Sequence, residues 1–141
     1  MSSPYKDMRE HIARYLASNG EDGHRFDNGT CCLVLTSTGR KSGEPRLVAL
    51  VYGRTGGDYV VVASRGGADR HPDWFHNITA DNRVRVQVGA DVFEATARLA
   101  TAEEYPAVWQ QMVAIFPPYA EYQKKTARRI PVVILSPGSG E

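Results

Sequence analysis

The residues best suited to bind a charged ligand lie together between positions 36 and 46. The segment Thr36-Ser37-Thr38-Gly39-Arg40-Lys41-Ser42-Gly43-Glu44-Pro45-Arg46 holds two glycines, three cations and four hydroxyls. Glycine permits positive φ and a close backbone approach, so amide N–H groups can point at an anion. Arginine and lysine add charge-assisted bonds to phosphate or carboxylate oxygens. The segment therefore has the chemistry of an anion-binding loop, and the alternative is a solvated basic hairpin turn.

Other reactive side chains form no recognisable catalytic or metal pattern. His71 and His76 have no third Cys, His or carboxylate at a metal-ligand spacing, so we expect no metal site. Ser64 lacks the Gly-x-Ser-x-Gly context of a nucleophile elbow. Cys31 and Cys32 are adjacent, a spacing unsuited to an ordinary disulfide, and are predicted to be buried apolar residues of a cytoplasmic protein.

Composition describes an ordinary globular chain. The 141 residues are 42% hydrophobic and 23% charged, with a formal net charge of +1. This length predicts one domain, and the small net charge argues against a nucleic-acid partner. No apolar run approaches the ~20 residues of a membrane span, and the polar N-terminus does not resemble a secretory signal.

The periodicity of apolar residues predicts how the anion-binding loop is held. Residues 4–17 are predicted to form an amphipathic helix, and residues 18–29 a loop. This helix mixes apolar residues with three cations, so contact with the inner face of a membrane is an alternative to packing on the sheet. From residue 30 onward strand signals dominate, and residues 137–141 are expected to be a flexible tail. The predicted strands are 31–37, 46–52, 59–64, 83–88, 92–99 and 130–135.

Three short helices are predicted between these strands. Pro72 suits the first turn of a helix reaching Ala80. Thr101 and Glu104 have the spacing of a capping box for a helix to about Phe116, with Pro106 marking a start or a kink. Residues 119–126 supply the third helix. The pattern predicts an α+β fold: a small, mainly antiparallel six-stranded barrel with short peripheral helices.

Five motifs in order carry a resemblance to a known family. They are Thr38-Gly39-Arg40-Lys41-Ser42-Gly43-x-Pro45-Arg46, Ala63-Ser64-x-Gly66-Gly67, Pro72-x-Trp74-x-x-Asn77, Tyr119-x-x-Tyr122 and Ile130-Pro131-Val132-Val133. Together they resemble the deazaflavin (coenzyme F420)-dependent nitroreductases, which include F420H2-dependent quinone reductases. The resemblance implies a split β-barrel like that of FMN-binding proteins over residues 30–136, an actinobacterial or related origin, and hydride transfer from F420H2 to a small electron acceptor.

The resemblance also implies roles for individual residues. Arg40, Lys41, Ser42 and Arg46 would hold the cofactor's phosphate and polyglutamate tail. Tyr119, Tyr122 and Ser64 would position the substrate. The remaining cofactor contacts would come from two strands and one helix: Leu47, Val48, Ala49, Leu50 and Val51; Val62, Ala63, Ser64 and Arg65; and Asp73, Trp74, Phe75, His76 and Asn77, with Tyr119.

Two departures from the family pattern bear on these roles. Position 65, commonly Lys in the family, is Arg here, and a guanidinium fork is not equivalent to an ammonium. Position 51 is Val where relatives can carry an aromatic residue, and Tyr52 beside it should face the opposite side of the strand.

Three functions remain open at this point: an F420H2-dependent reductase, an FMN-dependent enzyme on the same barrel, and a non-catalytic F420 binder. Trp74 and Phe75 have core packing as their alternative. The residues do not identify the physiological acceptor or set the oligomeric state.

Overall fold

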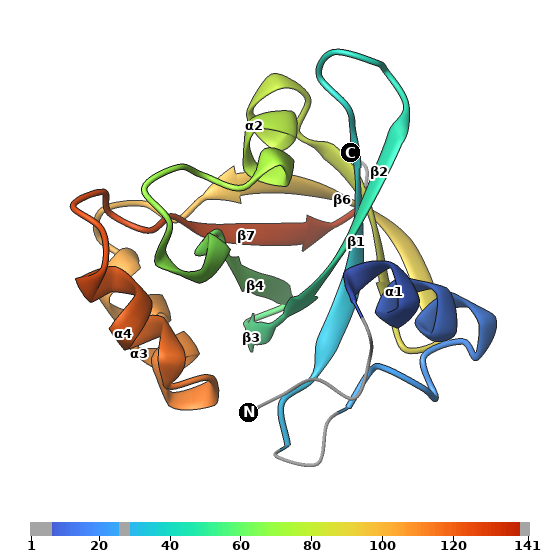
Figure 1. Ribbon diagram of the computed structural model, residues 1–141, viewed down its shortest axis with the longest axis horizontal. Helices are drawn as coiled ribbons and strands as arrows, with labels where there is room; N and C mark the ends of the chain where they lie inside the picture. The colour runs from blue at the N-terminus through green and yellow to red at the C-terminus, as the bar shows by residue number, and fades with distance from the viewer. Residues whose placement is uncertain (1–6, 26–28, 139–141) are drawn as a thin grey trace.

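The architecture is a curled antiparallel sheet with helices on its outside (Figure 1). The computed structural model describes residues 7–25 and 29–138. The sheet order is β2-β1-β5-β6-β7-β4-β3. Its strands are β1 (Cys32–Thr38), β2 (Pro45–Val51), β3 (Gly53–Thr55), β4 (Asp58–Val62), β5 (Arg83–Val88), β6 (Asp91–Leu99) and β7 (Val132–Pro137).

The chain connectivity explains why the sheet curls. The strands at its two edges, β2 and β3, are separated in sequence by Tyr52 alone. A flat seven-stranded sheet would place these edges far apart, because neighbouring strands lie about 4.8 Å from one another. The sheet must therefore bend back on itself, which produces the split β-barrel that the sequence predicts.

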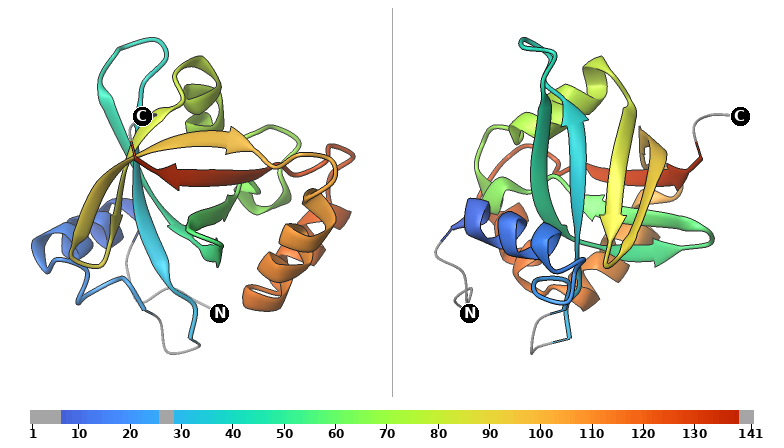
Figure 2. Two further views of the ribbon diagram at one scale, coloured as in Figure 1. Left: turned by 180° about the vertical axis from the view of Figure 1, so that it is seen from behind. Right: turned by 90° about the vertical axis from the view of Figure 1, so that its right-hand side faces the viewer.

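Four helices surround the sheet (Figure 2). Helix α1 (Met8–Ala17) lies beside β1 and β2, whereas α2 (Asp73–Ala80) lies near the loop joining these strands. Helices α3 (Tyr105–Ile115) and α4 (Pro118–Lys124) pack side by side against β4 and β7. A short 3-10 turn, Arg65–Gly67, follows β4.

Strand alternation divides the apolar residues into two cores. In β4, Val61 faces the barrel interior with Leu33, Leu35 and Val133, whereas Val60 belongs to the cluster beneath α3 and α4. The same alternation places Tyr52 against the interior core and Val51 against the outer one. The predicted opposition of Val51 and Tyr52 is confirmed.

The prediction of six strands is wrong by one, because a further short strand, β3, lies between the predicted strands 46–52 and 59–64. Gly56 and Gly57 alone make the turn between β3 and β4, and Gly53 pairs with Val60 across it. The capping box is confirmed: the Thr101 N–H donates to Glu104 Oε1 at 2.7 Å, and the Glu104 N–H donates to Thr101 Oγ1 at 3.2 Å. The helix itself begins at Tyr105 with Pro106 in its first turn. The predicted helical residues 4–6 and tail residues 139–141 lie outside the described residues.

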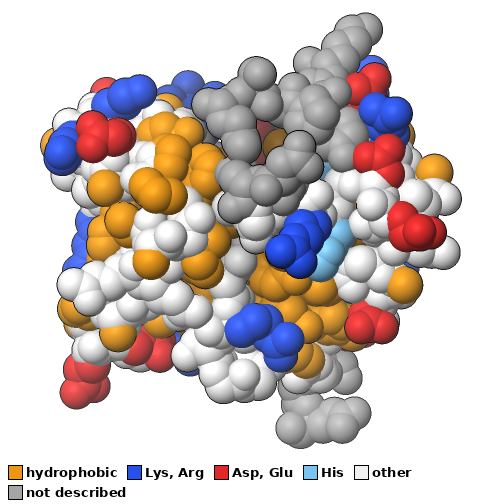
Figure 3. Space-filling view, turned by 90° about the horizontal axis from the view of Figure 1, so that it is seen from below, with side chains coloured by type: hydrophobic (Ala, Val, Ile, Leu, Met, Phe, Trp, Pro, Cys, Tyr) orange, Lys and Arg blue, Asp and Glu red, His pale blue; other side chains and the backbone are white. Residues whose placement is uncertain are grey.

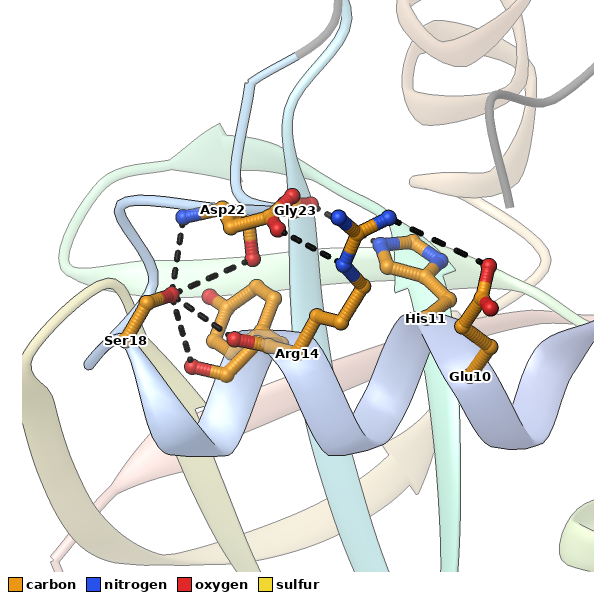
Figure 4. A network of polar contacts seen from close by, with 7 residues as sticks. Glu10, His11, Arg14, Ser18, Asp22 and Gly23 are labelled. Atoms are coloured by element: carbon orange, nitrogen blue, oxygen red, sulfur yellow. Dashed lines mark hydrogen bonds and ion pairs between the residues drawn. The ribbon is translucent and has the colours of Figure 1, made fainter.

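Helix α1 is bonded to the loop that follows it (Figure 4). Ser18 Oγ donates to the Arg14 carbonyl at 2.8 Å and accepts from the Asp22 N–H at 2.8 Å. The Arg14 guanidinium lies 3.1 Å from the Asp22 carboxylate. On the inner side of the helix, the Tyr15 hydroxyl donates to the Cys32 carbonyl at 3.0 Å and accepts from the Gly89 N–H at 2.7 Å. These bonds attach α1 to the barrel.

Charged and apolar side chains are mixed on the surface seen from below. On the coloured part of the face seen from below, Lys and Arg side chains lie singly among hydrophobic and polar ones (Figure 3). They form no continuous basic stripe on this part of the surface. Among the described residues, no helix combines the length and hydrophobicity needed to span a bilayer.

Candidate functional site

A cavity of about 600 Å³ lies where the β1–β2 loop meets the start of α2. Four cationic side chains and a single carboxylate line it, so the cavity carries positive charge. The lining residues are Gly39, Arg40, Lys41, Ser42, Arg46, Leu47, Val48, Arg65, Pro72, Asp73, Trp74 and Asn77. The structure therefore brings the predicted anion-binding loop, the start of β2 and the first turns of α2 to one place.

The loop is attached to α2 through Asn77, which is only 3% exposed. The Arg40 guanidinium donates to Asn77 Oδ1 at 2.9 Å, and the Arg40 N–H donates to the same oxygen at 3.2 Å. The Asn77 amide donates to Ser37 Oγ at 3.3 Å. A buried amide with satisfied partners fixes its neighbours, so Asn77 sets the position of the loop. Sequence reasoning had given Asn77 a cofactor contact and had not found this role.

The three cations of the loop differ in how far they bond to the protein itself. Ser42 Oγ accepts from the Glu44 N–H at 3.2 Å and from Arg46 Nη2 at 3.3 Å. The Arg40 guanidinium lies 3.7 Å from the Asp73 carboxylate. Lys41 is exposed and has no hydrogen bond or ion pair within residues 7–25 and 29–138. Of the three loop cations, Lys41 is therefore the one least committed to the protein itself.

Gly39 is required by a close approach in this loop. A Cβ at Gly39 would lie 2.6 Å from Ser42 Oγ and 3.2 Å from the Glu44 carbonyl oxygen. The Gly39 N–H donates to that carbonyl at 2.8 Å and closes the hairpin. A side chain here would displace Ser42 and open the turn.

The opposite wall of the cavity is the segment after β4. Arg65 has φ of +47°, and Gly66 and Gly67 also have positive φ. A left-handed conformation is unfavourable for arginine, so the surrounding contacts must hold it. Ser64 precedes it with φ −81° and ψ −39°, and this right-handed, left-handed sequence points successive N–H groups into a concavity that suits negatively charged oxygen.

The two aromatic residues of α2 differ in what they contact. Trp74 is 7% exposed and both lines the cavity and packs in the interior core. Phe75 is 8% exposed, belongs to the core and does not line the cavity. His76 also lies outside the lining, with its ring centre 5.7 Å from that of His71.

Several residues predicted to contact the cofactor do not line this cavity: Ala49, Leu50, Val51, Val62, Ala63, Ser64 and Tyr119. On β2 the lining ends at Val48, so the later residues of that strand lie beyond the cavity. Ala49 is on the side of β2 that meets α1, where its N–H lies 3.4 Å from Met8 Sδ. Val62 lies under α3 and α4. Leu50 packs against the interior core.

Tyr119 and Tyr122 lie together on α4, as their spacing predicts. Their ring centres are 6.1 Å apart, and Phe116 is packed beside both. Tyr119 is 5% exposed, the arrangement expected of core packing. Its hydroxyl has no hydrogen-bond partner among the described residues, yet no buried unsatisfied side-chain atom is found there, so the oxygen keeps access to solvent. Burial raises the pKa of this hydroxyl, which stays protonated as a donor at neutral pH.

Sequence reasoning missed Arg128, a half-buried residue after α4. Its guanidinium bonds to the segment between Ala63 and His71, the wall that carries Arg65. The partners are mainly backbone carbonyls more than 50 positions upstream, so no sequence spacing could indicate them.

A second depression, of about 760 Å³, lies on the outer face of β1, β2, β5 and β6. Its charged side chains bond to one another: Arg85 lies 3.2 Å from Glu94 and Arg83 lies 3.4 Å from Asp81. The cavity beside the anion-binding loop is smaller, but its charge is less neutralised. We therefore take that cavity as the candidate site.

Comparison with known proteins relates nearly all of the described residues to one protein family. The family model described as F420H(2)-dependent quinone reductase matches residues 7–137. A Mycobacterium tuberculosis protein named F420H(2)-dependent quinone reductase is 39% identical over 132 residues, which are 92% of this chain and 89% of that protein.

Two solved structures are similar to this chain in both sequence and fold. A structure of an F420-H2 dependent reductase is 44% identical, has a TM-score of 0.69, and covers 74% of this chain and 93% of its own. A second structure, described as a domain-swapped dimer, is 39% identical with a TM-score of 0.73 over 91% of this chain and 96% of its own.

Proposed function

This chain belongs to the F420H(2)-dependent quinone reductase family, and from that premise we propose that it is an oxidoreductase that uses reduced coenzyme F420 to reduce a quinone or another electron-poor acceptor. The observation that carries the proposal is the cavity that Arg40, Lys41, Arg46 and Arg65 line together with Trp74 and the start of α2. Such a cavity suits a ligand with one flat apolar part and one anionic part.

The residues of the cavity fit the two parts of the cofactor. The loop cations match a phosphate and a polyglutamate tail, and Arg65 on the opposite wall would reach a polar edge of the ring. When bound, the cofactor supplies the hydride, because deazaflavin chemistry is two-electron chemistry that the protein itself does not perform.

The protein's own contribution is to bind and to orient. Lys41 and Arg46 would hold the anionic end, whereas Arg40, tied to Asn77, would keep the loop in place while contributing charge. Leu47, Val48 and Trp74 exclude water from the apolar part of the cavity. Tyr119 and Tyr122 would align the acceptor, since hydride transfer requires reacting atoms about 3–3.5 Å apart.

Two alternative functions make different demands on the cavity. An FMN-dependent enzyme must bind one phosphate, for which Arg46, Lys41, Arg40 and Arg65 would be an excess of cations. A non-catalytic F420 binder would need the same cavity but no space for an acceptor. The cationic lining favours F420 over FMN.

The test is anaerobic turnover. Purified protein is mixed with F420H2 and a soluble naphthoquinone, and reoxidation of the cofactor is followed by its absorbance. We expect the protein to reoxidise F420H2 when the quinone is present, and we expect little reoxidation when the quinone is left out. Tight F420 binding with no turnover for any quinone or nitroaromatic tested would favour the non-catalytic binder.

Contact of α1 with a membrane surface remains a prediction. Met8 and Leu16 are 48% and 40% exposed on this helix, which would suit contact with a membrane. Against it, the cation Arg14 is paired within the protein, with Asp22 and, at 4.0 Å, with Glu10. Co-sedimentation with anionic vesicles tests it: binding that Met8→Ser and Leu16→Ser remove would support membrane contact, and no sedimentation would refute it.

A further inference from the structure

The segment Ala63–His71 follows β4 and supplies the Arg65 wall of the cavity. Its conformation is unfavourable at Arg65, a non-glycine residue with a φ of +47°, whereas Gly66 and Gly67 adopt positive φ at little cost. Its internal backbone bonds are short-range: the Gly67 N–H donates to the Ser64 carbonyl at 2.9 Å, and the Ala68 N–H to the Arg65 carbonyl at 3.1 Å. Support for this wall must therefore come from another part of the chain.

One side chain supplies most of that support. Arg128 Nε donates to the Ala68 carbonyl at 2.7 Å, Nη2 to the Ser64 carbonyl at 2.7 Å, and Nη1 to the Ala63 carbonyl at 3.3 Å. Nη1 also lies 2.9 Å from His71 Nδ1, which accepts when the ring is neutral. One guanidinium thus bonds to both ends of the segment and to its middle.

The chemistry of this arrangement is unusual for an arginine. Among residues 7–25 and 29–138, no carboxylate lies within ion-pair distance of Arg128, and its hydrogen bonds go to backbone carbonyls and to His71. Burial lowers the pKa of this half-buried group, and the charge of the nearby Asp69 carboxylate partly offsets that effect. Four contacts from one guanidinium to one segment argue against an incidental surface contact.

Arg128 is itself attached to the helix that carries the two tyrosines. Gln123 of α4 donates to the Arg128 carbonyl at 2.7 Å and accepts from the Ile130 N–H at 3.0 Å. A second contact joins the same parts: a Cβ at Gly67 would lie 2.6 Å from the Tyr122 carbonyl oxygen. The cavity wall and α4 are therefore joined through Arg128 on one side and through Gly67 on the other.

We infer that Arg128 is a positioning residue, whose guanidinium holds the Ala63–His71 wall against α4 in the conformation that binds the cofactor. This inference rests on the proposed function for the identity of the ligand. The donor geometry makes arginine specific: one planar group reaches three carbonyls, whereas a lysine ammonium at the same place can reach one or two.

The test compares Arg128→Lys and Arg128→Ala with Arg129→Ala, the matched control. Arg129 is the adjacent cation, but it lies over the Tyr105 ring at 3.7 Å and does not contact the wall. Two readouts are used: the dissociation constant for F420, and hydrogen exchange of the amides of residues 64–68 in protein without cofactor. The second readout does not depend on activity.

We expect Arg128→Lys to raise the F420 dissociation constant about tenfold and Arg128→Ala more, with faster exchange of the wall amides, while Arg129→Ala matches the wild type. Millimolar guanidinium should restore part of the affinity of Arg128→Ala, and an equal concentration of sodium should not. Unchanged exchange and unchanged affinity in Arg128→Lys would overturn the inference. If the wild type does not bind F420, the proposed function fails, and the exchange readout still decides whether Arg128 holds the wall.

Discussion

Removing Lys41 should weaken cofactor binding without affecting the fold. Lys41 lines the cavity, is exposed and has no polar partner among the described residues, so Lys41→Ala leaves no group unsatisfied. A hydrogen bond to a charged group contributes about 1–3 kcal/mol, which corresponds to a roughly 5- to 150-fold rise in the dissociation constant. The free energy of unfolding of the apoprotein should be unchanged.

Arg40→Ala provides an informative contrast. Its guanidinium donates to Asn77 Oδ1 at 2.9 Å, so its removal should also destabilise the apoprotein, by about 1 kcal/mol after allowance for partial exposure. The assay is fluorescence titration with F420 at low and high salt, together with urea unfolding. Affinity should fall as salt is added, because partly exposed charges are screened.

Lys124→Ala is the matched control, because Lys124 is an exposed lysine on α4 that does not line the cavity and lies 3.4 Å from Glu121. It should leave F420 binding unchanged. If Lys41→Ala and Lys124→Ala bind F420 equally well, or if salt has no effect on wild-type binding, the argument that the loop binds an anionic tail is refuted.

Three further predictions concern the segment after β4 and helix α4, which packs against it. Gly67→Ala should destabilise the protein by more than the ~1–2 kcal/mol of left-handed strain, because its Cβ would lie 2.6 Å from the Tyr122 carbonyl oxygen. Gly56→Ala, at a φ of +58° with open space around it, should cost only that strain. Equal urea midpoints for the two variants would contradict this prediction. Tyr119→Phe and Tyr122→Phe should lower turnover several-fold with melting temperature and F420 affinity nearly unchanged; a loss of stability with normal turnover would show that the tyrosines only pack. Burial lowers the pKa of His71, and the positive charges of Arg128 and His76 lower it further. The unfolded state therefore binds the proton first, and stability falls as the pH drops below about 6.5. His71→Asn should reduce this loss of stability between pH 7.5 and 5 in urea unfolding, and a pH dependence identical to that of the wild type would refute the prediction.

The parts of the fold that sequence predicted are those set by local patterns. The alternation in β2 placed Val51 and Tyr52 on opposite faces, and the structure confirms this. The capping box at Thr101 formed as its spacing requires, although the helix begins at Tyr105, where Pro106 fits the first turn. Only β3 was missed, because three residues beside a Gly-Gly turn are too few to show an alternating pattern.

The candidate site was predictable in its chemistry but not in its supports. The cations of the loop and Trp74 were identified from residue type and from the family resemblance, and they line one cavity. Asn77 was predicted as a cofactor contact, and its bond to the loop was not foreseen, since a buried amide bonded to the Arg40 N–H cannot be distinguished in sequence from a ligand contact. Arg128 was absent from the prediction because arginine bonding to distant backbone carbonyls leaves no pattern in the sequence.

The most direct test of the account is a paired titration of the purified wild-type protein with F420 and with FMN. A cavity lined by Arg40, Lys41, Arg46 and Arg65 should favour the polyanionic tail over a single phosphate. We expect F420 to bind at least tenfold more tightly than FMN, with the difference shrinking as salt is added. Equal affinity for the two cofactors, or binding of FMN alone, would contradict the assignment of F420 to this site.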